Sequence, residues 1–231
     1  MTVAAPPAPP PERVYSSDSL GDILHRLGDI PAARVRVDPQ PGTATLADLT
    51  WVNECGPGPA CELIDGTLVE KPVGFHESSL ATLVGFALLR FLDDHDLGMI
   101  VGEAAVMEIL PGIGRAPDVA FIAWASLPGG IPPPREDAVP AVVPDLAVEV
   151  LSASNTRREM ARKRAEYFRA GVKLVWEIDP ATRSATVYTA DDAGTAVPAD
   201  GTLTGDPVLP GFVLSLKAVF DRAERRGAAK G

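Results

Sequence analysis

Two carboxylates occupy comparable places in apolar stretches of this chain. Asp118 follows Pro117 near the start of the apolar segment 116–124, and Glu149 lies in the middle of the segment 146–151. A carboxylate inside an apolar strand is costly to desolvate, so it needs a metal ion, a cationic side chain or several hydrogen bonds. Two such acids brought side by side repel each other, and a hard divalent cation with oxygen ligands removes that conflict. The pair therefore indicates a metal site. The alternative is that Asp118 caps a strand end while Glu149 pairs with an arginine of the next helix.

The segment after Glu149 is predicted to be that helix. Thr156 and Glu159 have the spacing of a capping box, and Gly171 is placed to end the helix as its C′ residue. Lys163 lies one helical turn from Glu159 and one turn from Tyr167. We therefore expect Lys163 at the boundary of the buried face, within reach of Glu149.

The same helix is strongly basic. It carries Arg157, Arg158, Arg162, Lys163, Arg164 and Arg169 against Glu159 and Glu166. A run of this kind is usually only a solvated face. If the acids form a metal site, however, Arg157, Arg158 and Arg162 are candidates to hold a nucleic-acid backbone.

The composition limits the classes of protein. The chain has 231 residues, of which 46% are hydrophobic, enough for one core. No apolar run reaches the roughly 18 residues that span a bilayer, and residues 1–13 lack the pattern of a secretory signal. The net charge of -10 argues against non-specific coating of DNA but leaves room for a local basic patch. With only two cysteines, Cys55 and Cys61, neither a disulfide framework nor a zinc site is expected, and a cytoplasmic location is the default.

The elements that must position the two acids follow from periodicity and turn signals. We expect a helix over 16–27 that ends at Gly28, a short helix near 48–52 capped by Thr45, and a hairpin over 61–71 that turns at Asp65-Gly66. A core-facing helix over 78–92 precedes paired strands over 100–110 and 116–124 and a Pro- and Gly-rich loop over 127–143. A hairpin of 174–178 with 185–189, a last strand and a short helix complete the chain.

This order predicts an α/β (mixed α+β) fold, with a mixed sheet that carries helices on both faces. We divide the chain into a disordered Pro-rich tail (1–13), an N-terminal helical and extended appendage (14–44), one main domain (45–222) and a loose C-terminal tail (223–231).

A series of motifs runs through the main domain. They are ELIDG at 62–66 with LVE at 68–70, RAPDVAF at 115–121, PDLAVEVLS at 144–152, Lys163, YF at 167–168, AGV at 170–172, VW at 175–176 and DP at 179–180. In this order they resemble the Uma-two (Uma2) family of restriction-endonuclease-like proteins, within the PD-(D/E)XK nuclease superfamily. The resemblance covers about 46–220, and its specificity lies in the ordered series, since any one motif alone is weak.

The resemblance implies a restriction-endonuclease-like core, mainly a four-stranded central sheet flanked by helices, with Asp118 and Glu149 as the paired metal-binding acids. It implies that Glu62 is the upstream acid that completes or orients the site, and it makes His76 an accessory candidate, as we also take Tyr167 to be. The superfamily motif places a lysine two residues after the second acid, where this chain has Leu151. The resemblance implies that Lys163 on the next helix replaces it.

Three hypotheses follow for the function. The first is an endonuclease dependent on Mg²⁺ (or Mn²⁺) that acts on nucleic acid, with DNA as the expected substrate and Lys163 positioning the attacking water. The second is a nuclease-fold module with little or no turnover and a binding or regulatory role. The third is a purely structural role in which Glu149 pairs only with Arg162 or Lys163. A homodimer is one expected assembly, and no membrane partner is expected.

Overall fold

The computed structural model describes residues 18–72 and 74–225. The predicted tail 1–13, the start of the predicted appendage and residues 226–231 of the predicted C-terminal tail lie outside this part. No helix in the described part is long and apolar enough to cross a membrane.

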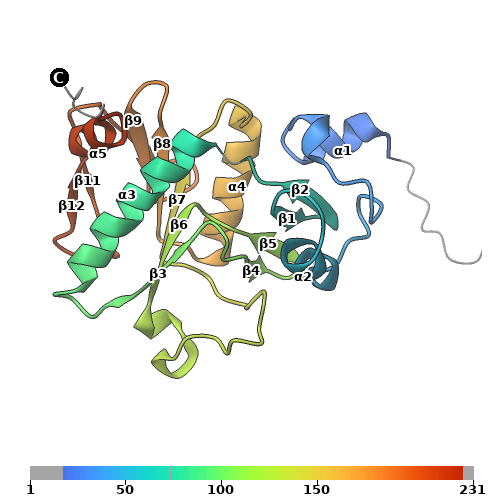
Figure 1. Cartoon of the computed structure of the whole chain (residues 1–231), viewed down its shortest axis with the longest axis horizontal. Coiled ribbons are helices and arrows are strands. Elements are labelled where there is room, and N and C mark those ends of the chain that lie inside the picture. Colours follow the sequence, from blue (N-terminus) through green and yellow to red (C-terminus); the bar gives the residue numbers. More distant parts are fainter. Residues whose placement is uncertain (1–17, 73, 226–231) are drawn as a thin grey trace, which may run out of the picture.

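The centre of the fold is a six-stranded mixed sheet (Figure 1). Its strand order is β10 (Gly194–Val197), β9 (Ser184–Tyr188), β8 (Leu174–Asp179), β7 (Leu146–Val150), β6 (Val119–Ala123) and β3 (Gly98–Gly102). Only β7 and β8 are parallel neighbours, and the helix α4 (Arg157–Ala170) connects them. The predicted mixed sheet with flanking helices is confirmed, although it has six strands where the resemblance implied mainly four.

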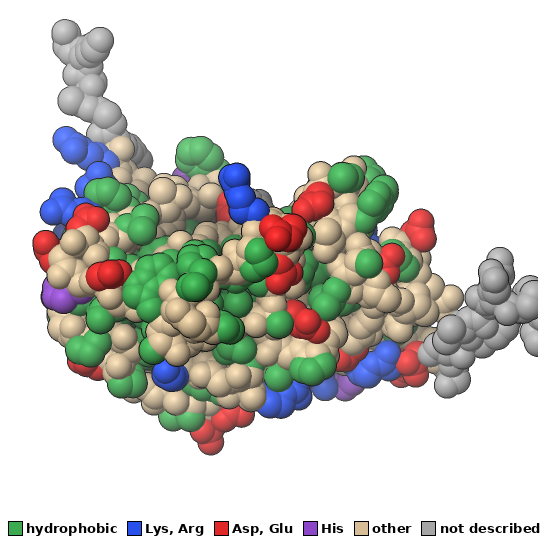
Figure 2. Space-filling view, turned by 90° about the horizontal axis from the view of Figure 1, so that it is seen from below, with side chains coloured by type: hydrophobic (Ala, Val, Ile, Leu, Met, Phe, Trp, Pro, Cys, Tyr) green, Lys and Arg blue, Asp and Glu red, His purple; other side chains and the backbone are tan. Residues whose placement is uncertain are grey.

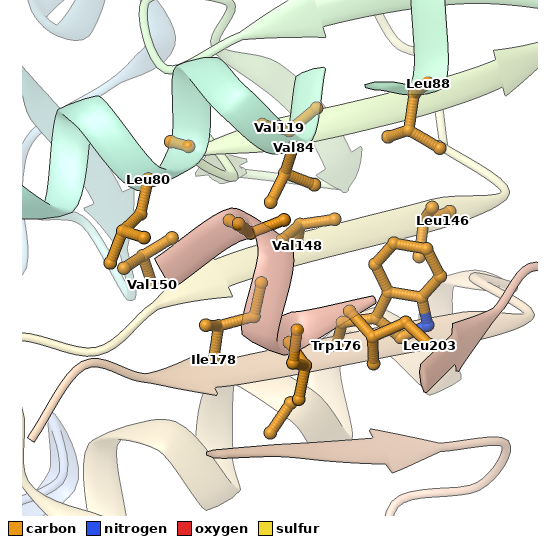
Figure 3. Packing of buried hydrophobic residues seen from close by; sticks show 14 of the residues in the cluster. Leu80, Val84, Leu88, Val119, Leu146, Val148, Val150, Trp176, Ile178 and Leu203 are labelled. Atoms are coloured by element: carbon orange, nitrogen blue, oxygen red, sulfur yellow. The ribbon is translucent and has the colours of Figure 1, made fainter. Parts of the chain in front are cut away.

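Helices cover both faces of this sheet. On one face, α3 (Phe75–Leu92) and α5 (Leu216–Ala223) pack over β6, β7 and β8. Figure 3 shows Leu80 and Val84 of α3 directed toward Val150 and Val148 of β7, and Leu88 directed toward Leu146 of the same strand. On the other face, Tyr167 of α4 packs with the alternate strand residues Ala147 and Val175. Because side chains alternate between the two faces along a strand, the residues immediately before and after Val148 and Val119 in the sequence lie on the face that α4 covers.

A second, four-stranded sheet lies beside the first, in the order β2 (Thr67–Glu70), β1 (Cys61–Ile64), β5 (Ile113–Arg115) and β4 (Met107–Leu110). The predicted hairpin is confirmed as β1 and β2, with Asp65 and Gly66 both at positive φ in the turn. The predicted continuous strand over 100–110 was wrong. The chain turns after Gly102, so that β3 pairs with β6 in one sheet while β4 pairs with β5 in the other.

Helix α4 begins and ends as predicted. Thr156 is its N-cap in a capping box with Glu159, and Gly171 follows at φ 109. The N-terminal elements are α1 (Leu20–Arg26), the 3₁₀ turn Ala32–Arg34 and α2 (Leu46–Glu54), of which α1 and the turn lie against the hairpin and the start of α4. The last elements are β11 (Thr202–Thr204), β12 (Val213–Ser215) and α5, which includes Ala223 of the predicted tail. The predicted loop over 127–143 contains only the 3₁₀ turn Pro128–Gly130.

Candidate active site

Asp118 and Glu149 face each other on adjacent strands. Val119 pairs with Val148 in the antiparallel ladder of β6 and β7, which puts Asp118 opposite Glu149 one step further along. The backbone continues this pairing, because the amide of Asp118 donates to the carbonyl of Val148 and the amide of Val150 donates to Asp118 Oδ2 at 2.7 Å. Like charges directly opposite each other on neighbouring strands are destabilising, so this pair needs counter-charge.

Glu149 receives its counter-charge from α4. Lys163 Nζ lies 2.9 Å from both carboxylate oxygens of Glu149, and the Tyr167 hydroxyl donates to Glu149 Oε1 at 2.6 Å. The prediction that Lys163 reaches back to this acid is confirmed. Burial raises the pKa of Glu149 to about 7, against the opposing effect of Lys163 and with a further contribution from the charge of Asp118.

Glu62 joins the same cluster from β1. Its Oε1 lies 3.0 Å from Lys163 Nζ and accepts from the amide of Ala116 at 3.0 Å, while Arg115 donates to its Oε2 at 2.7 Å. Burial acts to raise the pKa of Glu62, but Lys163 and Arg115 outweigh it and hold that pKa well below its usual range. The structure therefore brings together the upstream acid, the two facing acids and the helix lysine.

Two cations of this cluster were missed by the sequence reasoning. Arg115 is fully buried and bridges Glu62 to Glu166 of α4. Lys71, the residue after β2, is also buried, and its Nζ lies 2.9 Å from Asp118 Oδ1. The available signal for both was a cationic residue at the end of an apolar strand, where burial requires a carboxylate partner.

The three candidate backbone-binding arginines have different surroundings. Arg157 is exposed and has no hydrogen-bond or ion-pair partner within 18–72 and 74–225. Arg158 contacts His25 and Asp29 of the N-terminal segment. Arg162 contacts Asp65, Glu166 and the carbonyl of Arg26. Two of the three are thus engaged within the protein.

The two accessory candidates, Tyr167 and His76, lie in different surroundings. Tyr167 is fully buried in the acid cluster, and burial together with the charge of Glu149 raises its pKa well above the usual value. His76 is exposed in the first turn of α3, with its ring edge-on to Phe75. The structure therefore places Tyr167 in the cluster and gives His76 no contact with it among the described residues.

A cleft of about 410 Å³ reaches the cluster at Asp118. It runs between α3 and β3, and its lining includes Ser78, Thr82, Phe86 and Glu103. The Asp118 side chain is 13% exposed, compared with 7% for Glu149. A ligand in the cleft would therefore meet Asp118 first.

The acids of the cluster are potential ligands of a metal ion. Within the described residues, no group of three or more His, Cys, Asp and Glu side chains is arranged to hold a metal. However, Mg²⁺ is commonly held by one or two carboxylates together with water, and Asp118 and Glu149 supply that ligand type. These two acids fit Mg²⁺ by donor chemistry, with Lys71 and Lys163 as the cations they now contact.

Comparison with known proteins identifies the family and a similar fold. Residues 43–217 match the model of the Uma2 family, described as "Putative restriction endonuclease". The fold is similar to the crystal structure of a protein described as a putative nuclease belonging to DUF820 from Anabaena variabilis ATCC 29413. The TM-score is 0.64 at 18% sequence identity, and the similarity covers 78% of this chain and 98% of that one. No curated protein matches the chain. These findings confirm the predicted family resemblance and fold.

Proposed function

Because the chain belongs to the Uma2 family of restriction-endonuclease-like proteins, we propose that it is a metal-dependent endonuclease that hydrolyses phosphodiester bonds in DNA. The observation that carries this proposal is the buried cluster at the paired strands β6 and β7, where Asp118 and Glu149 face each other beside Lys163. Buried acids with a perturbed pKa beside a cleft are a common feature of catalytic sites.

In this proposal Asp118, Glu149 and the backbone carbonyl of Val150 hold Mg²⁺ or Mn²⁺. When bound, the ion supplies Lewis-acid polarisation of the phosphate and lowers the pKa of a bound water. The ammonium group of Lys163 is held in place by two carboxylates, those of Glu149 and Glu62. A cation fixed in this way aligns the attacking water and stabilises the negative charge that develops on the phosphate.

The remaining residues position these groups. The Tyr167 hydroxyl restrains the Glu149 carboxylate, and Arg115 restrains Glu62. Arg115 also donates to Glu166 of α4. Helix α4 therefore carries Lys163 and also holds the arginine that restrains Glu62, the second carboxylate that contacts Lys163. Arg157 is the remaining candidate for contact with the nucleic-acid backbone, since its guanidinium has no partner within the described chain.

The test is cleavage of DNA by purified protein in Mg²⁺ or Mn²⁺, compared with Asp118→Asn, Glu149→Gln and Lys163→Met. Each substitution should lower the rate at least about 100-fold, as expected when a charged group of a catalytic site is removed. Glu136→Gln, an acid exposed in the loop before β7, is the matched control and should leave the rate unchanged. Cleavage by Asp118→Asn and Glu149→Gln at the wild-type rate would show that the hydrolysis has another origin.

A second candidate function is a binding or regulatory module that retains the nuclease fold. This function is favoured because each acid of the site already forms an ion pair with a cationic side chain of the protein. The pairs are Asp118 with Lys71, Glu149 with Lys163 and Glu62 with Arg115. Calorimetric titration with Mn²⁺ and a nuclease assay separate the candidates. A module that binds metal shows heat without cleavage, whereas a purely structural cluster shows neither heat nor a metal-dependent shift in Tm.

A further inference from the structure

The two lysines of the acid cluster differ in how their amines are used. Lys163 Nζ contacts Glu149 and Glu62, which engages its donors with protein oxygens. Lys71 Nζ lies 2.9 Å from Asp118 Oδ1 as an ion pair, yet within the described chain it makes no contact with the geometry of a hydrogen bond. An ammonium group has three N–H donors, so Lys71 holds unused donors inside the protein.

This arrangement is costly in the absence of a ligand. The Lys71 side chain is 5% exposed, and the amine nitrogen itself is buried. A buried charge with unfilled donors loses the hydrogen bonds of water without replacing them, which costs free energy. Such a group is retained most readily where a ligand completes its contacts.

The surroundings of Lys71 define the chemistry of that ligand. Its ion-pair partner, Asp118, lines the cleft between α3 and β3, whereas the buried amine of Lys71 contacts Asp118 without lining the cleft itself. The other two acids of the cluster are already matched, Glu62 by Arg115 and Glu149 by Lys163. The unfilled donors of Lys71 therefore suit an anionic oxygen.

We propose that Lys71 is a substrate-binding residue whose amine, reached when the Asp118 side chain turns aside, donates to a non-bridging oxygen of a nucleic-acid phosphate in the cleft at Asp118. The inference rests on the proposed function and adds to it a second cation with a separate role. Lys163, held by Glu149 and Glu62, aligns the attacking water, while Lys71 binds an oxygen of the substrate phosphate.

A simpler role for Lys71 is neutralisation of Asp118 alone. The two roles predict different results when Asp118 is made neutral. If Lys71 only offsets the charge of Asp118, replacing Lys71 in the Asp118→Asn background changes nothing in phosphate binding. If Lys71 contacts the phosphate, the loss persists in that background, because the contact does not depend on the charge of Asp118.

The experiment measures binding of a fluorescein-labelled DNA oligonucleotide by anisotropy in EDTA, so that neither metal nor turnover contributes. The proteins are wild type, Lys71→Met, Asp118→Asn and the double variant, with Lys71→Arg as the variant that keeps the charge. Lys173→Met is the matched control, because Lys173 also forms an ion pair with an aspartate, Asp145, outside the cluster. Thermal unfolding of each variant shows that it is folded at the assay temperature.

We expect Lys71→Met to raise the Kd by about 10- to 100-fold, the range for loss of a charge-assisted hydrogen bond. The double variant should bind more weakly than Asp118→Asn by a similar factor. Lys71→Arg should retain most of the affinity, and Lys173→Met should match wild type. A double variant that binds as tightly as Asp118→Asn overturns the proposal, as does a wild-type protein that does not bind the oligonucleotide.

Cleavage is measured separately in Mn²⁺, so the two proposals fail differently. A wild type that binds through Lys71 without cleaving supports the role of Lys71 and overturns the nuclease function. A wild type that cleaves while Lys71→Met binds and cleaves normally overturns the role of Lys71 and leaves the nuclease function standing.

Discussion

Among the site residues, Glu149 is the one whose charge state depends most on its surroundings. Its carboxylate is buried between a lysine, a tyrosine hydroxyl and the facing acid Asp118. Glu62 lies in an equally buried place, but Arg115 and Lys163 both act on it and keep it ionised. Two neighbouring carboxylates thus have pKa values shifted in opposite directions, which lets one bind and release a proton near neutral pH while the other stays charged.

The raised pKa of Glu149 predicts a pH-dependent stability. Between its usual value of 4.5 and the folded-state value of about 7, the folded protein holds a proton that the unfolded chain has lost. Stability conferred by that proton is therefore present at low pH and is lost as the pH rises through about 7. Glu149→Gln, which stays neutral, should lack this dependence.

The measurement is urea denaturation of wild type and Glu149→Gln without metal across pH 5–8. The free energy of unfolding of wild type should fall relative to that of the variant as the pH rises. A difference between the two proteins that stays constant over this range would show that Glu149 does not titrate there.

At the scale of elements, the N-terminal segment 18–42 fixes the helix that carries Lys163. Arg34 forms two hydrogen bonds with Glu159, at 3.0 and 2.8 Å, and the Thr156 hydroxyl donates to the carbonyl of Gly28 at 2.5 Å. Glu159 lies one turn before Lys163, so these contacts hold the turn of α4 that enters the site. The family match begins at residue 43, which leaves this segment outside the matched region.

Gly28 offers a direct probe of this packing. It has φ +95, and a Cβ there would lie 2.5 Å from Glu159 Cα and 2.6 Å from Glu159 N, both backbone atoms. Gly28→Ala must therefore separate the segment from α4, and we expect it to cost roughly 2–4 kcal/mol of stability. Gly42→Ala is the matched control, because Gly42 has a similar φ of +92 and a Cβ there would meet nothing within 4 Å.

Chemical denaturation of both variants measures the difference. Gly42→Ala should lose only about 1–2 kcal/mol, the cost of the backbone conformation. Equal losses in the two variants would mean that the contact between Gly28 and Glu159 adds nothing to stability.

At the scale of the molecule, the charge distribution limits how nucleic acid can be held. The net charge is -10, and Arg158 and Arg162 are engaged by the N-terminal segment and the β1–β2 hairpin. On the face shown in Figure 2, Lys and Arg side chains occur in small separate groups, with hydrophobic and acidic side chains between the groups. The face shown carries no continuous basic band, and we expect the affinity to come from a few contacts close to the cleft.

A weak dependence of DNA affinity on salt follows. Each neutralised phosphate contributes about 0.9 to the slope of log K against log salt, so one to three contacts give a slope of about -1 to -3. Anisotropy titrations in EDTA at several KCl concentrations measure it. A slope near -8 would instead require an extended basic interface, with Arg158 and Arg162 released from their present partners.

The expected homodimer stays a prediction that light scattering can check at the same protein concentrations.

Local sequence determined much of the architecture. The capping box of Thr156 and Glu159, the Asp65-Gly66 turn and the Gly171 helix end depend on residues within a few positions, and all three are as predicted. The facing acids were also predictable, because an isolated carboxylate in an apolar strand requires a partner. The break after Gly102 was not, since both halves of the segment 100–110 are apolar and their division depends on which sheet each half joins.

The sequence by itself therefore determined the family, most of the elements and the candidate acids Asp118, Glu149 and Glu62. Only the tertiary structure decided which cation each acid meets. Lys71 and Asp118 are far apart in the chain and come together because the small sheet packs beside the main one, and Lys163 reaches Glu149 because of the way α4 lies on the sheet. Electrostatic partners are chosen by distance in the folded protein, and sequence spacing carries that information only within a helix or a turn.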